Sequence, residues 1–179
     1  MKVLKRILPV LMIFSFLFIL TSCGYNFYND YKSKGAVLDN GDSFKVLVVD
    51  DVKKMREENK NFAIIIGTSN NESCVTAITK IQSEFNIVGY KGVAYYLDAT
   101  EAIKYQSKGA QLTSDLGVKG INPGSDGIIF VEYNGSRVLC DTSKNDEAGK
   151  KFRLNNLLEG SLLPRAIADY IVEYYSVEA

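Results

Sequence analysis

The stretch Phe62-Ala63-Ile64-Ile65-Ile66 is a continuous apolar run rich in β-branched residues. A run of this kind, with no polar alternation, is typical of a strand buried on both faces of a sheet. Segments with strand and helix patterns alternate on both sides of it. The predicted strands are 44–49, 62–66, 93–97, 128–133 and 137–140. The first predicted helix runs from an N-cap at Asp50 to Asn59, and the other predicted helices are 72–84, 100–116 and 163–175.

The order of these elements is β-α-β-α-β-α-β-β-α. Helical crossovers require the early strands to be parallel, whereas Asn134-Gly135 is a strong signal for a two-residue hairpin that makes the last pair antiparallel. The sequence therefore predicts the α/β class with a mixed central sheet. Gly109 weakens the middle of helix 100–116, and the last helix has Pro164 in its first turn.

Three basic residues near the start, Lys2, Lys5 and Arg6, precede an apolar run that ends in Leu20-Thr21-Ser22-Cys23. The run is shorter than a membrane span needs, and its last four residues resemble a bacterial lipobox. The resemblance implies that residues 1–22 are a lipoprotein signal peptide. Cys23 then carries a lipid that includes palmitate, and this lipid anchors the chain on the extracytoplasmic face of the cell membrane.

The remainder divides into residues 23–43, which we interpret as the lipidated N-terminus and a polar tether ending in a turn, and a single domain over residues 44–179. A composition rich in Lys, Asn, Ile and Tyr indicates a low-GC Gram-positive source. The whole chain holds 21 basic and 21 acidic residues, and the signal removes three of the basic ones. The resulting acidic balance excludes a typical nucleic-acid binder.

The chain has no histidine, which excludes Ser/His and Cys/His nucleophile pairs and every His-ligated metal site. Apart from Cys23, only Cys74 and Cys140 remain, too few for a thiolate zinc site. We therefore expect no metal and no cofactor. Because Cys140 ends a predicted edge strand several strands from the helix that holds Cys74, we expect no disulfide between them.

The order of elements over residues 44–175 resembles a thioredoxin-like domain. The residues that carry the resemblance are Phe62–Ile66, Leu116–Ile121 before a candidate cis-proline, and the hairpin of Phe130–Gly135. It implies a three-layer α/β/α sandwich with a mixed central sheet. The chain is most similar to secreted thioredoxin-like proteins of Gram-positive bacteria, including bacteriocin transport accessory proteins.

The family's chemistry uses a C-x-x-C motif at a helix N-terminus, where the helix dipole stabilises a thiolate. In one register the motif falls on Asn71-Glu72-Ser73-Cys74, so that Asn71 replaces the attacking cysteine. In the other, Cys74 is the attacker and Ala77 the lost partner. Either register implies that the dithiol is gone.

Two further positions also differ from the family's redox motif, and both differences imply a loss of dithiol chemistry. The family's buried acid corresponds to Ile65 and its motif tryptophan to Asn70. Pro123 is the candidate cis-proline, although an ordinary trans turn remains an alternative. Cys74 is the candidate catalytic residue if it is a lone activated thiol, and a small buried hydrophobe otherwise.

Three functions follow as hypotheses. The first is a lipid-anchored binding or accessory module without dithiol exchange, whose partner is an extracytoplasmic protein or peptide. The second is a single-cysteine thiol–disulfide exchange enzyme or isomerase that requires an activated Cys74. The third is an accessory role in bacteriocin export or immunity, which rests on analogy of fold alone.

Overall fold

The computed structural model describes residues 26–39, 43–121, 127–142 and 163–175. Cys23 and Pro123 therefore lie outside the described residues, as do the predicted signal peptide and most of the charged segment after Asp141.

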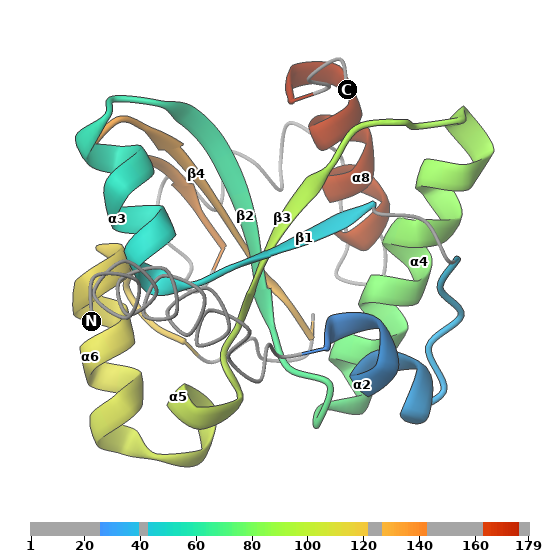
Figure 1. Cartoon of the computed structure of the whole chain (residues 1–179), viewed down its shortest axis with the longest axis horizontal. Helices are drawn as coiled ribbons and strands as arrows, with labels where there is room; N and C mark the ends of the chain where they lie inside the picture. Colours follow the sequence, from blue (N-terminus) through green and yellow to red (C-terminus); the bar gives the residue numbers. More distant parts are fainter. Residues whose placement is uncertain (1–25, 40–42, 122–126, 143–162, 176–179) are drawn as a thin grey trace, which may run out of the picture.

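A five-stranded mixed sheet forms the centre of the molecule (Figure 1). Its strand order is β1-β3-β2-β4-β5. The strands β1, β3 and β2 are parallel, β4 runs antiparallel to β2, and β5 runs antiparallel to β4. The strands are β1 (Phe44–Leu47), β2 (Asn61–Gly67), β3 (Ala94–Asp98), β4 (Ile129–Asn134) and β5 (Arg137–Asp141).

The central strand is β2, the apolar run that decides the fold. Its residues from Phe62 to Gly67 are buried, and they alternate between two separate cores. Ala63 and Ile65 face one core, and Ile64 and Ile66 face the other. This alternation explains why the run lacks polar residues, since both faces of the strand are covered.

Helices cover both faces of the sheet (Figure 1). Residues of α2, α4 and α8 line one core together with Ile65, and residues of α3 and α6 line the other together with Ile64. The prediction of a three-layer α/β/α sandwich with a mixed central sheet is confirmed. The helices are α2 (Phe27–Ser33), α3 (Val49–Glu57), α4 (Glu72–Val88), α5 (Thr100–Lys104), α6 (Gln106–Leu116) and α8 (Leu163–Tyr174).

The interpretation of residues 23–43 as a tether is corrected by α2. Asn26 caps this helix by accepting a hydrogen bond from the amide of Asn29. Phe27 and Tyr31 lie four residues apart, on one helical face, and both are buried. The ring of Phe27 packs 4.6 Å from that of Tyr96. Residues 27–38 therefore belong to the folded domain.

Helix 100–116 is also corrected, because it breaks into α5 and α6 at Tyr105. Gly109, which was expected to weaken the helix, lies inside α6. A Cβ at this position would come 2.7 Å from the carbonyl oxygen of Ala102, so glycine allows α5 to approach α6 closely. Near the start of the domain, α3 begins at Val49 and its N-cap is Val48, not Asp50.

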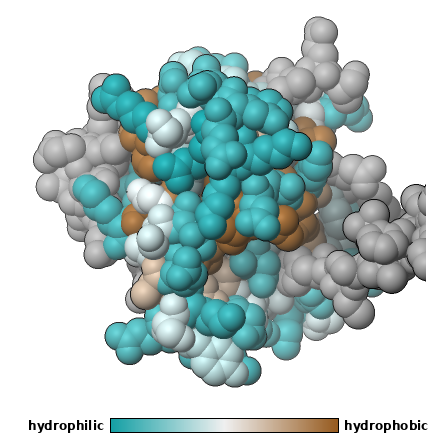
Figure 2. Space-filling model, turned by 60° about the vertical axis from the view of Figure 1, so that its left-hand side comes forward, coloured by the Kyte–Doolittle hydropathy of each residue, from teal (hydrophilic) through white to brown (hydrophobic). Residues whose placement is uncertain are grey.

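The surface seen in Figure 2 is largely hydrophilic, and apolar residues show through only between polar ones. No helix in the described ranges has both the length and the apolar character to span a membrane.

Candidate active-site region at the start of α4

The start of α4 follows directly after the carboxyl end of β2 and a short connection, Thr68–Asn71. This is the edge of the sheet where parallel strands end, the usual position of sites in open α/β sheets. Asn71 is the N-cap, and its side-chain oxygen accepts a hydrogen bond from the amide of Cys74 at 3.3 Å. Asn71 is half-buried, whereas Glu72 and Ser73 are exposed.

Cys74 lies in the first turn of α4 and is fully buried, with 0% of its surface exposed. Its sulfur accepts a hydrogen bond from the amide of Thr68 at 3.2 Å. The hydroxyl of Tyr31 lies 3.0 Å from the same sulfur and 2.9 Å from the hydroxyl of Tyr96. Two groups, the Thr68 amide and the Tyr31 hydroxyl, therefore hold the sulfur inside the core, and Tyr96 contacts the second of them.

Burial raises the pKa of Cys74 from its ordinary value of 9.0 to about 11. The hydrogen bonds from Tyr31 and Thr68 lower the pKa, but their effect is smaller than that of burial, and the charge of Asp98 raises it further. At pH 7 a thiol with this pKa is ionised in roughly one molecule in ten thousand. Since the thiolate is the nucleophile, this environment suppresses the reactivity of Cys74.

Two glycines allow the backbone to close around Cys74. A Cβ on Gly67 would overlap the Cys74 sulfur, and a Cβ on Gly127 would overlap the backbone of Ser73 and Cys74. Gly127 also has φ +76°, which favours glycine. The segment that leads into β4 thus runs directly against the first turn of α4.

The connections after β2 and β3 meet through a chain of polar side chains. The hydroxyl groups of Thr68 and Thr100 lie 2.6 Å apart, and the Thr100 hydroxyl donates to the carboxylate of Asp98 at 2.8 Å. Beside this pair lies an open cavity of about 420 Å³. It is lined by Thr68, Asn70, Asn71, Glu72, Thr100, Ile103 and Lys104. The cavity offers polar groups for binding, but the Cys74 sulfur does not line it.

The structure therefore brings together Asn71, Glu72, Ser73 and Cys74, with Gly127 against them, but it separates the cysteine from the surface. Ile65 is buried in the same core as Cys74, and Asn70 is exposed. Cys140 lies on the edge strand β5, opposite Glu132. Cys74 and Cys140 are buried and form no disulfide with each other.

Sequence reasoning missed Tyr31 and Tyr96 as neighbours of the cysteine. Tyr31 lies in the segment interpreted as a tether, because the polar residues around it obscure the helical pattern of the sequence. The available signal was Asn26 as an N-cap followed by Phe27 and Tyr31 at helical spacing. Thr68 and Thr100 were missed as well, and nothing local in the sequence indicates that their hydroxyl groups meet.

Across the described ranges no group of three or more Cys, Asp or Glu side chains is arranged to hold a metal ion. The chain matches no model of a known protein family and no curated protein sequence.

Proposed function

We propose that the protein is a lipid-anchored, extracytoplasmic module of thioredoxin-like architecture that binds a protein or peptide partner and lacks dithiol–disulfide exchange activity. The observation that carries this proposal is the environment of Cys74, a fully buried thiol whose pKa is raised to about 11. A thiol in this state is a structural element of the core rather than a nucleophile.

The position of Asn71 supports the first of the two motif registers. An attacking thiol belongs at the helix cap, near the unpaired amides and in contact with solvent. Asn71 occupies the cap and Cys74 lies buried further along the first turn. In the other register the second motif position is Ala77, which is also buried and faces the core.

Single-cysteine exchange, the alternative function, requires the Cys74 sulfur to leave the hydrogen bonds from Tyr31 and Thr68 and to reach solvent. Both its burial and its raised pKa oppose that step. The binding role is supported by the polar-lined cavity at the start of α4, next to the exposed apolar side chain of Ile103.

The redox part of the proposal is tested by an insulin-reduction assay with dithiothreitol. We expect the wild-type chain and Cys74→Ala to give the same background rate. Asn71→Cys recreates a C-x-x-C motif in the favoured register and should gain a reversible disulfide and measurable turnover, whereas Ala77→Cys should gain neither. Turnover by the wild-type chain that disappears in Cys74→Ala would establish the exchange enzyme instead.

The anchor is tested by metabolic labelling with a clickable palmitate analogue and by membrane fractionation. The motif at Leu20–Cys23 predicts that label and membrane retention depend on Cys23. Cys23→Ala should abolish both, while Cys74→Ala, the matched control, should keep both. Retention of the label in Cys23→Ala contradicts the anchor.

The partner is tested with a photo-crosslinking residue placed at Ile103, beside the cavity. Intact cells should give a specific crosslinked protein or peptide. The same residue at exposed Val88, at the far end of α4, should not give that product. Identical products from both positions would contradict a binding role for this edge of the sheet.

A further inference from the structure

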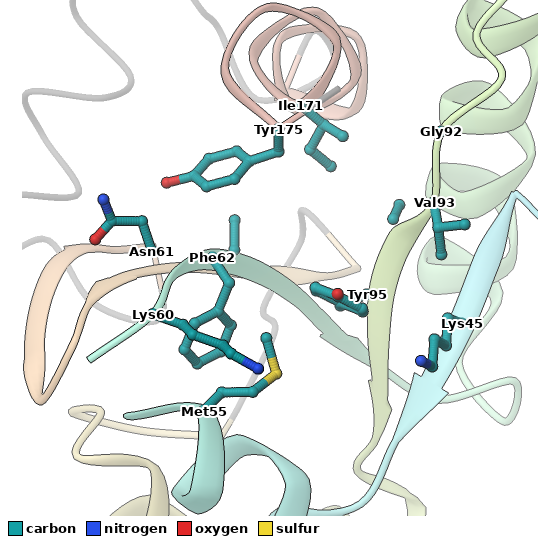
Figure 3. A pocket seen from close by; sticks show the side chains of 12 residues that line it. Lys45, Met55, Lys60, Asn61, Phe62, Gly92, Val93, Tyr95, Ile171 and Tyr175 are labelled. Carbon is teal, nitrogen blue, oxygen red and sulfur yellow. The ribbon is translucent and has the colours of Figure 1, made fainter. Parts of the chain in front are cut away.

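A second cavity lies at the opposite end of the parallel strands from Cys74 (Figure 3). Its lining includes the first residues of β2 and β3, whereas the cavity at the start of α4 follows the ends of those strands. Its volume is about 450 Å³, within the range of small-molecule sites. Cys74 is not among its lining residues.

The wall of this cavity is mostly apolar and comes from separate elements. Met55 of α3, Phe62 of β2 and Tyr95 of β3 line one side, and Ile171 and Tyr175, from α8 and the residue after it, extend over the other (Figure 3). Phe62 is held in place by a stacked contact with Tyr133 at 4.8 Å. Part of the wall is therefore rigid and aromatic.

The charged side chains that line the cavity are all positive. Its described lining residues include Lys45 and Lys60 and no acidic residue. In Figure 3 the amino groups of both lysines extend from opposite sides toward the space beneath Tyr95. Lys60 is paired with Glu58 at 2.7 Å, whereas Lys45 forms no ion pair with any carboxylate in the described part of the chain.

We propose that this cavity binds a small monocarboxylate with an aromatic or branched apolar body. The apolar body packs against Phe62, Met55 and Tyr95, and burial of its surface supplies most of the affinity. The carboxylate lies at the open side, where Lys45 is its principal partner. Lys60 is already paired with Glu58 and contributes less. No acidic residue is among the described lining residues.

The proposal is tested with 3-(4-fluorophenyl)propionate as the probe, titrated by ¹⁹F NMR against the full chain in lipid nanodiscs. The matching amide, 3-(4-fluorophenyl)propionamide, has the same body and no charge. Empty nanodiscs give the signal of partition into lipid. We expect saturable binding of the carboxylate beyond that reference and weaker binding of the amide.

Three variants locate the site. Lys45→Met should weaken carboxylate binding about threefold to fivefold, the effect of one partly solvated ion pair, and leave the amide unaffected. Val93→Glu places a negative charge in the lining and should weaken carboxylate binding by about tenfold or more. Lys80→Met removes an exposed lysine of α4 outside the lining and should bind as the wild type does.

The proposal is overturned by any of three results. These are no saturation above the empty nanodiscs, equal affinity for carboxylate and amide, and equal effects of Lys45→Met and Lys80→Met. Ile103, where the binding role is tested by crosslinking, does not line this cavity, so the crosslinking result and probe binding can fail independently of each other.

Discussion

The hydroxyl of Tyr31 lies 3.0 Å from the sulfur of Cys74, although the two residues are 43 positions apart in the chain. This contact joins a helix at the start of the domain to the first turn of α4. It also explains how a polar sulfur and two phenols, those of Tyr31 and Tyr96, are satisfied inside an apolar core.

Tyr31→Phe should destabilise the fold by about 1–3 kcal/mol, because it leaves the Tyr96 hydroxyl and the Cys74 thiol with fewer partners in the core. Urea unfolding followed by far-UV circular dichroism measures the change. Tyr105→Phe removes an exposed hydroxyl and should change stability by less than about 0.5 kcal/mol. Equal effects of the two substitutions would show that the buried contact contributes nothing specific.

Cys74 should make the fold less stable as the pH rises from 9 to 11. The folded pKa is about 11 and the ordinary value is 9.0, so above pH 9 the unfolded chain loses the proton while the folded chain keeps it. The stability contributed by the thiol is fully present below pH 9. About 2–3 kcal/mol of it is lost by pH 11.

The measurement is the free energy of unfolding at several pH values for the wild type and for Cys74→Ala. Other groups that titrate in this range contribute to both proteins, so the difference between the two curves isolates the thiol. We expect the wild-type curve to fall more steeply between pH 9 and pH 11. Parallel curves would mean that the thiol is not protected in the folded state.

Gly127→Ala and Gly89→Ala form a matched pair. Both glycines have positive φ, +76° and +66°. A Cβ at Gly127 meets the backbone of α4 at Ser73 and Cys74, and a Cβ at Gly89 meets no atom within 4 Å. Gly89→Ala should cost about 1–2 kcal/mol from backbone strain alone.

Gly127→Ala adds a steric overlap to the same strain, and we expect a cost of about 3 kcal/mol or more. Thermal unfolding of both variants gives the comparison. If Gly127→Ala is no worse than Gly89→Ala, the segment before β4 does not press against the start of α4.

Glu132→Ala should loosen the attachment of the last helix. The carboxylate of Glu132 on β4 accepts hydrogen bonds from Tyr170 at 3.1 Å and from Tyr175 at 2.6 Å. Loss of these charge-assisted bonds should cost about 2 kcal/mol. Hydrogen exchange should quicken in α8 more than in α4.

Glu57→Ala is the control for this prediction, since Glu57 is exposed on α3. Its exchange pattern should match that of the wild type. Faster exchange spread evenly over the domain in Glu132→Ala would point to general destabilisation rather than to release of α8.

The sheet could be predicted from sequence because its signals are local. The apolar run at Phe62–Ile66 predicted the central strand, and Asn134-Gly135 predicted the hairpin. The two loop residues are Gly135 and Ser136, one position later than predicted, because Asn134 pairs with Arg137 in the sheet. Crossover rules then limited the early strands to a parallel arrangement. These signals rest on period and turn chemistry, and they do not depend on distant contacts.

The site could be predicted only in part. The helix start at Asn71 follows from capping preference, and Cys74 follows from its place in that turn. The burial of Cys74 depends on Tyr31, on Gly67 and on Gly127, which lie on other segments. Long-range packing of this kind leaves no periodic pattern in the sequence, so the sequence left both an activated and a buried thiol open.

The helix α2 also sets how far the domain can stand off from a bilayer. Phe27, its first residue, follows Cys23 by four positions, and four residues reach at most about 14 Å when fully extended. If Cys23 carries the lipid, the linker between the lipid and the domain is short, and it restricts the rotation of the domain relative to the membrane. The edge near α2 and Cys74 then stays beside the headgroups, and the lysine-lined cavity at the opposite end of the strands opens away from them.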